Sequence, residues 1–168
     1  MSHINKAKEI NQQHHTITKS DTVWPLHIEL TPIEREVGRW IEHTVDLGTL
    51  ALNNEQIIAS YGPESHYHEI NLELYKDERT DYRFNLSSED PKIFVVMEQI
   101  DSNNSPKLIA VTVSQAAIGN YLDGDYLVLS TALPLPIQAW MEAFIGRHGE
   151  LLELGRKKRK GAGRSCGQ

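Results

Sequence analysis

The most constraining feature of this 168-residue chain is a stretch of alternating apolar and polar residues between positions 67 and 113. Alternation with a period of two is typical of a β-strand that buries one face. It occurs at residues 67–74 and again at residues 81–86, where the apolar positions are Ile70, Leu72, Leu74, Tyr82, Phe84 and Leu86. Residues 93–97 are all apolar, which indicates a strand covered on both faces. Residues 108–113 supply a fourth strand.

Short polar turns connect these four strands. The connecting segments, residues 76–80, 87–91 and 101–106, are rich in Asp, Ser, Asn and Pro. Sequential strands joined by such short turns pair antiparallel. The sequence therefore predicts an α+β fold with a mainly antiparallel sheet, arranged as a meander or as a partly closed barrel or roll. A C-terminal amphipathic helix is expected to pack on this sheet.

The residues before this stretch predict two further strands and a short helix. Residues 23–30 alternate, with apolar side chains at Trp24, Leu26, Ile28 and Leu30. Thr31-Pro32-Ile33-Glu34 has the form of a capping box, which predicts a short helix that ends near Gly38. Residues 39–52 read as a second strand, interrupted at Gly48.

The residues after it predict two helices and a last strand. Ser114 is placed to cap a short helix, and residues 126–130 form the strand. The clearest helix follows, with apolar residues spaced three and four apart at Ile137, Trp140, Met141, Phe144 and Ile145. His148 ends this stripe, at a helix C-terminus whose dipole favours the charged imidazole, and Gly149 is placed to stop the helix.

Charge is distributed unevenly along the chain. The net charge is −6, yet six of the 17 basic residues and none of the 23 acidic residues follow Gly155. An acidic body argues against a nucleic-acid footprint spread over the fold, because phosphate binding needs a positive face. We predict one α+β domain at residues 21–152 between a mobile N-terminal tail, 1–20, and a basic mobile C-terminal tail, 153–168.

Composition narrows the class of protein further. No apolar run approaches the ~18 residues of a membrane span, and the N-terminus has no apolar signal core. Cys166 is the single cysteine, so no internal disulfide or cysteine-based metal site can form. A cytoplasmic protein is expected. Glycine-rich phosphate loops and nucleophile elbows are absent from the sequence, which predicts neither a catalytic residue nor a cofactor.

Three groups of residues are candidates for a site. His66 and His68 share one face of a strand and form a weak metal candidate, against the simpler reading of two polar residues at a strand edge. His148 ends the apolar stripe of the C-terminal helix. Five adjacent cations can contact an acidic protein surface, a nucleic acid or only solvent: Arg156, Lys157, Lys158, Arg159 and Lys160.

An ordered series of motifs gives the chain a resemblance to a known family. The series comprises Tyr82-Arg83-Phe84-Asn85-Leu86, Pro91, Phe94-Val95-Val96, Val111-Thr112-Val113-Ser114, Ala116-Ala117, Tyr121-Leu122-Asp123-Gly124, Pro136, Trp140, Phe144, His148 and the Lys/Arg cluster. It resembles a bacterial family of unknown function whose members are typically encoded beside molybdenum-dependent formate dehydrogenase genes. The similarity covers about residues 67–160. Tyr82, Asn85, Pro91, Trp140 and His148 look most like the family pattern.

The resemblance implies a non-enzymatic accessory role in maturation or assembly of a formate dehydrogenase. The expected partner is a protein, either a dehydrogenase subunit or a maturation factor, and no cofactor is implied. The expected contact residues are the five tail cations together with His148 and Asn85. Two alternatives stay open: a nucleic-acid-binding regulator that uses the basic tail, and a metal- or ligand-binding enzyme that uses His66 and His68.

Overall fold

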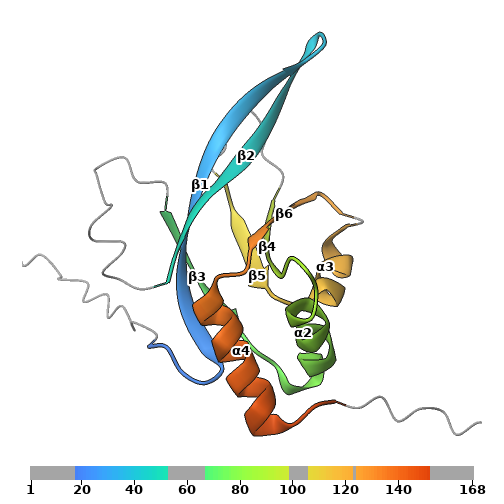
Figure 1. Ribbon diagram of the computed structural model, residues 1–168. Helices are drawn as coiled ribbons and strands as arrows, with labels where there is room; N and C mark the ends of the chain where they lie inside the picture. The colour runs from blue at the N-terminus through green and yellow to red at the C-terminus, as the bar shows by residue number, and fades with distance from the viewer. Residues whose placement is uncertain (1–17, 53–66, 99–105, 123, 152–168) are drawn as a thin grey trace, which may run out of the picture.

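The computed structural model describes residues 18–52, 67–98, 106–122 and 124–151, which form two antiparallel sheets and the helices packed against them (Figure 1). In the first sheet, β1 (Val23–Val37) lies between β2 (Trp40–Ala51) and β3 (Tyr67–Glu73). In the second, β4 (Lys92–Glu98) lies between β5 (Leu108–Thr112) and β6 (Tyr126–Ala132). The helices are the 3-10 helix η1 (Lys76–Glu78), α2 (Arg79–Leu86), α3 (Gln115–Leu122) and α4 (Leu135–His148).

This arrangement confirms the predicted α+β class with antiparallel sheets and a C-terminal helix. The described strands do not form one continuous or partly closed sheet, however. They form two open three-stranded sheets, because the chain between β3 and β4 is helical. No helix in the part of the chain that the structure describes is long and apolar enough to cross a bilayer.

The core lies where the two sheets meet α4. The predicted alternation in β1 is confirmed, since Trp24, Leu26, Ile28 and Leu30 are all buried. They join one apolar cluster with residues of β4 and with the α4 stripe that ends in Phe144 and Ile145. Trp24 meets Trp140 of α4 edge to face, with 5.4 Å between ring centroids. The Trp140 indole also donates a 2.9 Å hydrogen bond to the Ser20 carbonyl, which ties α4 to the start of β1.

The predicted helix at Thr31-Pro32-Ile33-Glu34 is wrong, because these residues continue β1. β1 pairs with β3 over Val23–Glu29 and with β2 over His27–Val37, so only the few positions from His27 to Glu29 lie between two strands. Pro25 and Pro32 both fall outside that region. A proline has no N–H to donate, and a strand tolerates it where one edge has no partner. The capping-box pattern was therefore outweighed by pairing with β2.

Gly38 makes the tight turn between β1 and β2 rather than ending a helix. Val37 pairs with Trp40, which leaves Gly38 and Arg39 as a two-residue loop. Gly38 has φ 64°, and no non-glycine residue of the described chain has a positive φ. A glycine at the first position followed by a residue with negative φ is the pattern of a type II′ hairpin.

The predicted break at Gly48 is a β-bulge instead. The register moves from Ile28–Leu50 to Leu30–Leu47, so Glu29 faces both Gly48 and Thr49. The Glu29 carboxylate accepts a 3.0 Å hydrogen bond from the Thr49 N–H. A Cβ at Gly48 would lie 2.6 Å from Glu29 Oε2, so a larger residue would displace this side chain. β2 continues to Ala51 through the bulge.

The predicted strand at residues 81–86 is also wrong, because this segment is helix α2. Tyr82 and Asn85 are buried at helical spacing, whereas Phe84 is 69% exposed. The apolar alternation of Tyr82, Phe84 and Leu86 was therefore not a burial pattern. Asn85 marks the buried face, and its polarity concealed that face in the sequence.

The remaining elements agree with the sequence patterns. The Ser114 hydroxyl accepts a 3.2 Å hydrogen bond from the Ala117 N–H at the start of α3, as predicted. In α4 the residues Ile137, Trp140, Met141, Phe144 and Ile145 are buried, and Gly149 ends the helix with φ 79°. Residues 126–130 lie within β6.

Candidate protein-binding surface

The β1–β2 hairpin extends beyond the body of the protein as a two-stranded arm. Its outer part, residues 30–47, which we call the hairpin arm, begins where β3 stops pairing with β1. At the base of the arm, Leu30 and Val45 are still buried in the core. Figure 1 shows the outer end of the arm extending beyond β3, the second sheet and all the helices. The first half of β1 alternates between half-buried and buried positions. Residues 31–37 of β1 instead alternate between half-buried and exposed positions and end with four exposed residues.

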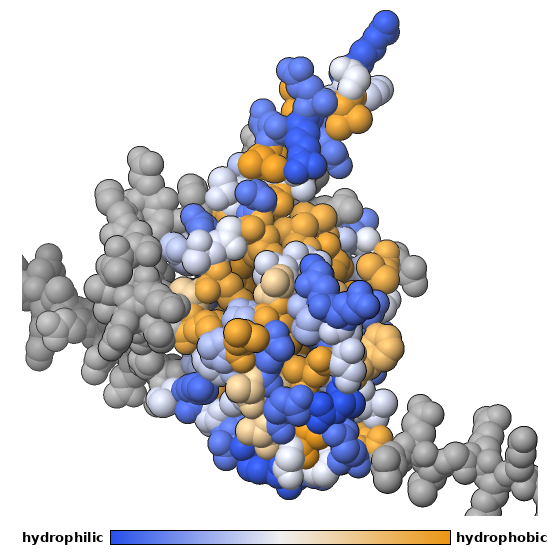
Figure 2. All heavy atoms as spheres, viewed as in Figure 1, coloured by the Kyte–Doolittle hydropathy of each residue, from blue (hydrophilic) through white to orange (hydrophobic). Residues whose placement is uncertain are grey.

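The tip of the arm presents large apolar side chains to solvent. Trp40 is 80% exposed, Ile41 61% and Val37 56%. Val37 is paired with Trp40 and therefore shares one face of the ribbon with it, whereas Ile41 pairs with Glu36 on the opposite face. Figure 2 shows apolar residues among the polar ones along the arm. An exposed tryptophan on a projecting ribbon is typical of a binding surface, because tryptophan is enriched among residues that dominate interface energies.

Polar pairs flank this tip. Glu34 lies 3.4 Å from His43 across the strands, and Arg35 pairs with Glu42. Opposite charges on facing strands, as at Arg35 and Glu42, stabilise a ribbon that has little core of its own. Charged side chains on a free strand edge also hinder uncontrolled edge-to-edge pairing. The arm thus combines an apolar tip with a polar stem.

A second polar cluster joins α2 to the end of α4. The Arg83 guanidinium binds both carboxylate oxygens of Glu142, at 2.8 and 2.9 Å, and also binds Glu150 at 2.7 Å. Arg79 donates to the carbonyl of His148 and, at 2.6 Å, to that of Gly149. An arginine at these carbonyls caps the helix and opposes the negative end of its dipole. The cluster fixes where the chain leaves α4.

His148 also lies in this cluster, where its surroundings favour the neutral imidazole. Its ring meets Phe144 at 4.6 Å between centroids. Desolvation and the positive charges of Lys76, Arg147 and Arg79 lower its pKa. This corrects the expectation that the helix dipole would favour a charged imidazole, because Arg79 already occupies the carbonyls at the helix end.

Asn85 is buried and binds the backbone of its own chain. Its side-chain N–H groups donate to the carbonyls of Lys92 and Val113, at 2.7 and 2.8 Å. Its carbonyl oxygen accepts from the Lys92 N–H at 2.9 Å. Asn85 therefore holds the turn from α2 into β4 and ties it to the end of β5. Its amide faces the interior, so it reaches a partner only indirectly.

The structure describes some of the other predicted site residues but not all of them. His68 lies on β3, paired with Ile28. His66 and the basic cluster Arg156–Lys160 lie outside the described residues, as do most of the two predicted tails. Within the residues that the structure describes, no three His, Cys, Asp or Glu side chains are grouped to hold a metal ion.

Comparison with known proteins assigns the family. A family model described as "Protein of unknown function (DUF3305)" matches residues 28–160, which is most of the chain. The chain belongs to the DUF3305 family. The match starts within β1 and so includes the whole hairpin arm, whereas the similarity noted from sequence motifs began near residue 67. No curated protein and no solved structure matches this DUF3305 protein significantly.

Sequence reasoning missed the hairpin arm, although a signal for it was present. Val-Gly-Arg-Trp places glycine at the first position of a two-residue turn between β-prone residues, a pattern typical of a type II′ hairpin. The competing capping-box pattern at Thr31 concealed it. Beside the contacts predicted at His148 and Asn85, the arm adds Trp40 and Ile41 as candidate contacts.

Proposed function

We propose that this DUF3305 protein is a non-enzymatic accessory protein that binds a protein partner through the hairpin arm. The observation that carries the proposal is the exposure of Trp40 and Ile41 at the tip of a projecting ribbon. Burial of an exposed tryptophan and isoleucine by a partner contributes several kcal/mol by order of magnitude. The side chains at the tip of the arm are not packed in the core of the protein.

The partner that we propose is a subunit or maturation factor of a molybdenum-dependent formate dehydrogenase. This part of the proposal is supported by the family resemblance of the motif series between residues 67 and 160. The basic cluster Arg156–Lys160 supplies a second, electrostatic contact to an acidic partner surface. The arm supplies the apolar contact.

Co-purification of the full chain from cells that express a formate dehydrogenase tests this function. We expect the wild-type chain to recover proteins of that system. Replacing Trp40 with Ala and Ile41 with Ser is expected to lower the recovery at least about tenfold, since central tryptophans dominate interface energies. Both side chains are exposed, so the melting temperature should change little.

Phe84→Ala is the matched control, because it also removes an exposed apolar side chain, but from α2. Its recovery should equal that of the wild-type chain. Recovery of no protein of the formate dehydrogenase system would overturn the proposed partner. Equal recovery by the arm variant and the control would overturn the role of the arm. Salt-sensitive binding to generic duplex DNA would instead support the nucleic-acid alternative.

A further inference from the structure

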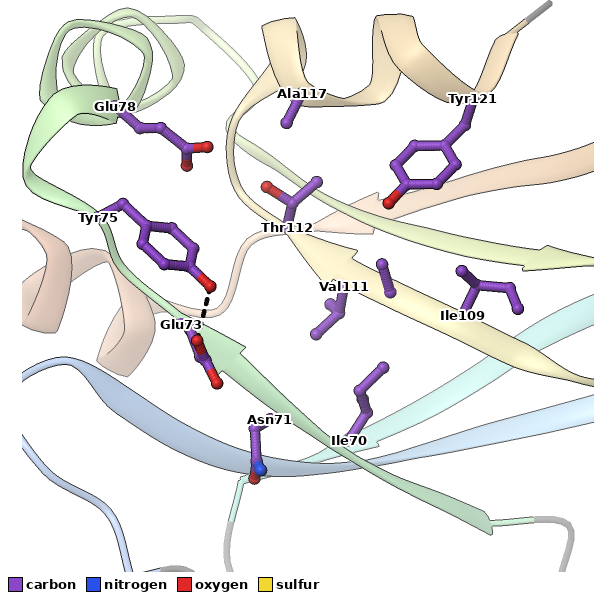
Figure 3. A pocket seen from close by; sticks show the side chains of 11 residues that line it. Ile70, Asn71, Glu73, Tyr75, Glu78, Ile109, Val111, Thr112, Ala117 and Tyr121 are labelled. Carbon is purple, nitrogen blue, oxygen red and sulfur yellow. Dashed lines mark hydrogen bonds between the residues drawn. The ribbon is translucent and has the colours of Figure 1, made fainter. Parts of the chain in front are cut away.

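A cavity of about 420 Å³ lies between the two sheets, where β3 and β5 face each other (Figure 3). β3 is an edge strand of the first sheet and β5 an edge strand of the second, so an edge of each adjoins the cavity. Four consecutive residues of β5, 109–112, line it. Consecutive strand residues point to opposite faces, so the cavity follows the strand edge.

The cavity has an apolar floor and an acidic end. Ile70 of β3, Val111 of β5 and Ala117 of α3 supply apolar contacts. Glu73 at the end of β3 and Glu78 in η1 supply two carboxylates, and Figure 3 shows Glu78 directed into the space beside Tyr75. An apolar wall with a few polar groups at one end is typical of a ligand pocket. Here the shape fits an aliphatic stem that ends in a charged group.

Within the residues that the structure describes, each of the two carboxylates is held by a tyrosine hydroxyl and not by a cation. The Tyr75 hydroxyl donates to Glu73 at 2.6 Å, and the Tyr82 hydroxyl donates to Glu78 at 2.7 Å. The hydrogen bond to Glu73, burial and the charges of Glu73 and Glu78 raise the pKa of Tyr75 to about 12. The lining residues include no Lys, Arg or His.

The neighbouring arginines are engaged elsewhere. Arg79 binds the carbonyls at the end of α4, and Arg83 binds Glu142 and Glu150. Within the described part of the chain, Glu73 and Glu78 form no ion pair. The cavity is therefore complementary to a positive charge that this part of the chain does not supply.

We propose that this cavity binds an arginine or lysine side chain carried by an extended segment of a partner polypeptide. Glu73 and Glu78 bind the cationic end, and Ile70, Val111 and Ala117 pack against the aliphatic stem. Beside the cavity, the described chain pairs β3 only with β1 and β5 only with β4, so their outer edges at residues 70–73 and 109–112 offer backbone N–H and C=O groups to the main chain of the segment. These edges favour a peptide over a small free amine. The proposal rests on the proposed function, since it places the segment in the protein partner.

A titration of the ¹⁵N-labelled full chain, followed by NMR, tests the cavity. The probe is the peptide acetyl-Gly-Val-Arg-Val-Gly-amide, and its match carries citrulline, a neutral isostere, in place of arginine. We expect the arginine peptide to shift the amides of residues 109–112 and of Glu73. The affinity of the citrulline peptide should be lower by about tenfold or more, because this peptide lacks the charge-assisted hydrogen bonds.

Glu78→Gln should weaken binding of the arginine peptide about tenfold. The glutamine can still accept from Tyr82, and the melting temperature checks that the variant is folded. Glu89→Gln is the matched control: Glu89 is exposed and does not line the cavity, so binding should be unchanged. Equal binding of the two peptides, or equal binding by Glu78→Gln and the wild type, would overturn the proposal.

Two further results separate this proposal from binding of a small free cation and from the proposed function. If n-butylguanidinium alone matches the affinity of the arginine peptide, the strand edges contribute nothing and the peptide assignment is overturned. The titration needs no natural partner. A failed titration beside arm-dependent co-purification therefore overturns the cavity alone, and a successful titration beside an empty co-purification overturns the proposed partner alone.

Discussion

The side-chain amide of Asn85 substitutes for regular backbone pairing where α2 gives way to β4. It satisfies the N–H and C=O of Lys92 and the C=O of Val113 from one buried position. Buried backbone groups without partners are costly, so this position needs a side chain that both donates and accepts. The position can be recognised from the structure but not from hydropathy, which assigns an asparagine to the surface.

Asn85→Ala is expected to lower the free energy of unfolding by about 2–4 kcal/mol, because three backbone groups lose their partner. Urea denaturation followed by circular dichroism measures the change. Asn120→Ala is the control, since Asn120 is exposed on α3 and should shift stability by no more than about 0.5 kcal/mol. Similar losses in the two variants would contradict the anchoring role of Asn85.

His148 should make stability depend on pH. Burial and nearby cations hold its pKa in the folded protein below the ordinary value of 6.5, so the unfolded chain binds a proton more readily. The stability that neutral His148 provides is therefore present above about pH 6.5 and is lost as the pH falls below it.

We expect His148→Gln to lose less stability than the wild type between about pH 7.5 and pH 5.5, as measured by urea denaturation at each pH. Comparing the two proteins cancels the contribution of the other histidines. Parallel pH profiles would show that His148 titrates alike in the folded and unfolded states.

At the scale of elements, periodicity predicted structure correctly where burial followed hydropathy. The β1 alternation and the α4 stripe succeeded because Trp24 to Leu30 and Ile137 to Ile145 meet one core. It failed at residues 81–86, where Phe84 is apolar but exposed and Asn85 is polar but buried. The capping-box pattern failed at Thr31, where it competes with strand pairing to residues beyond Gly38. Short segments carry too little local preference to resist such tertiary contacts.

Helix α4 should depend strongly on Trp140. The Trp140 ring is buried, packs edge to face on Trp24 and donates to Ser20. Trp140→Ala is expected to lower the free energy of unfolding by about 3–5 kcal/mol, and chemical denaturation measures it. Leu135→Ala on the same helix is the control, because Leu135 is 76% exposed and should change stability little. A loss below about 1 kcal/mol for Trp140→Ala would place the stripe outside the core.

At the scale of the whole molecule, the sequence predicted the class of fold but not its assembly. The strand orders β2-β1-β3 and β5-β4-β6 depend on pairings between distant segments, which local patterns do not encode. The cavity likewise joins Glu73 and Glu78 to residues 109–112 and to α3. The hairpin arm needed the register of β1 and β2 to be known. The arm therefore depends on pairing within the first sheet, and the cavity depends on how the two sheets pack.

The two halves of strand β1 differ in local stability. Its first half is held by β3 and the core, with β2 joining at His27–Glu29, whereas beyond Leu30 it is held by β2. Local opening should therefore require less free energy at the tip than at Leu26 or Ile28. A partner that binds the tip must order it, and that loss of conformational entropy reduces the net affinity. Such an arm therefore favours a complex that dissociates quickly over a long-lived one.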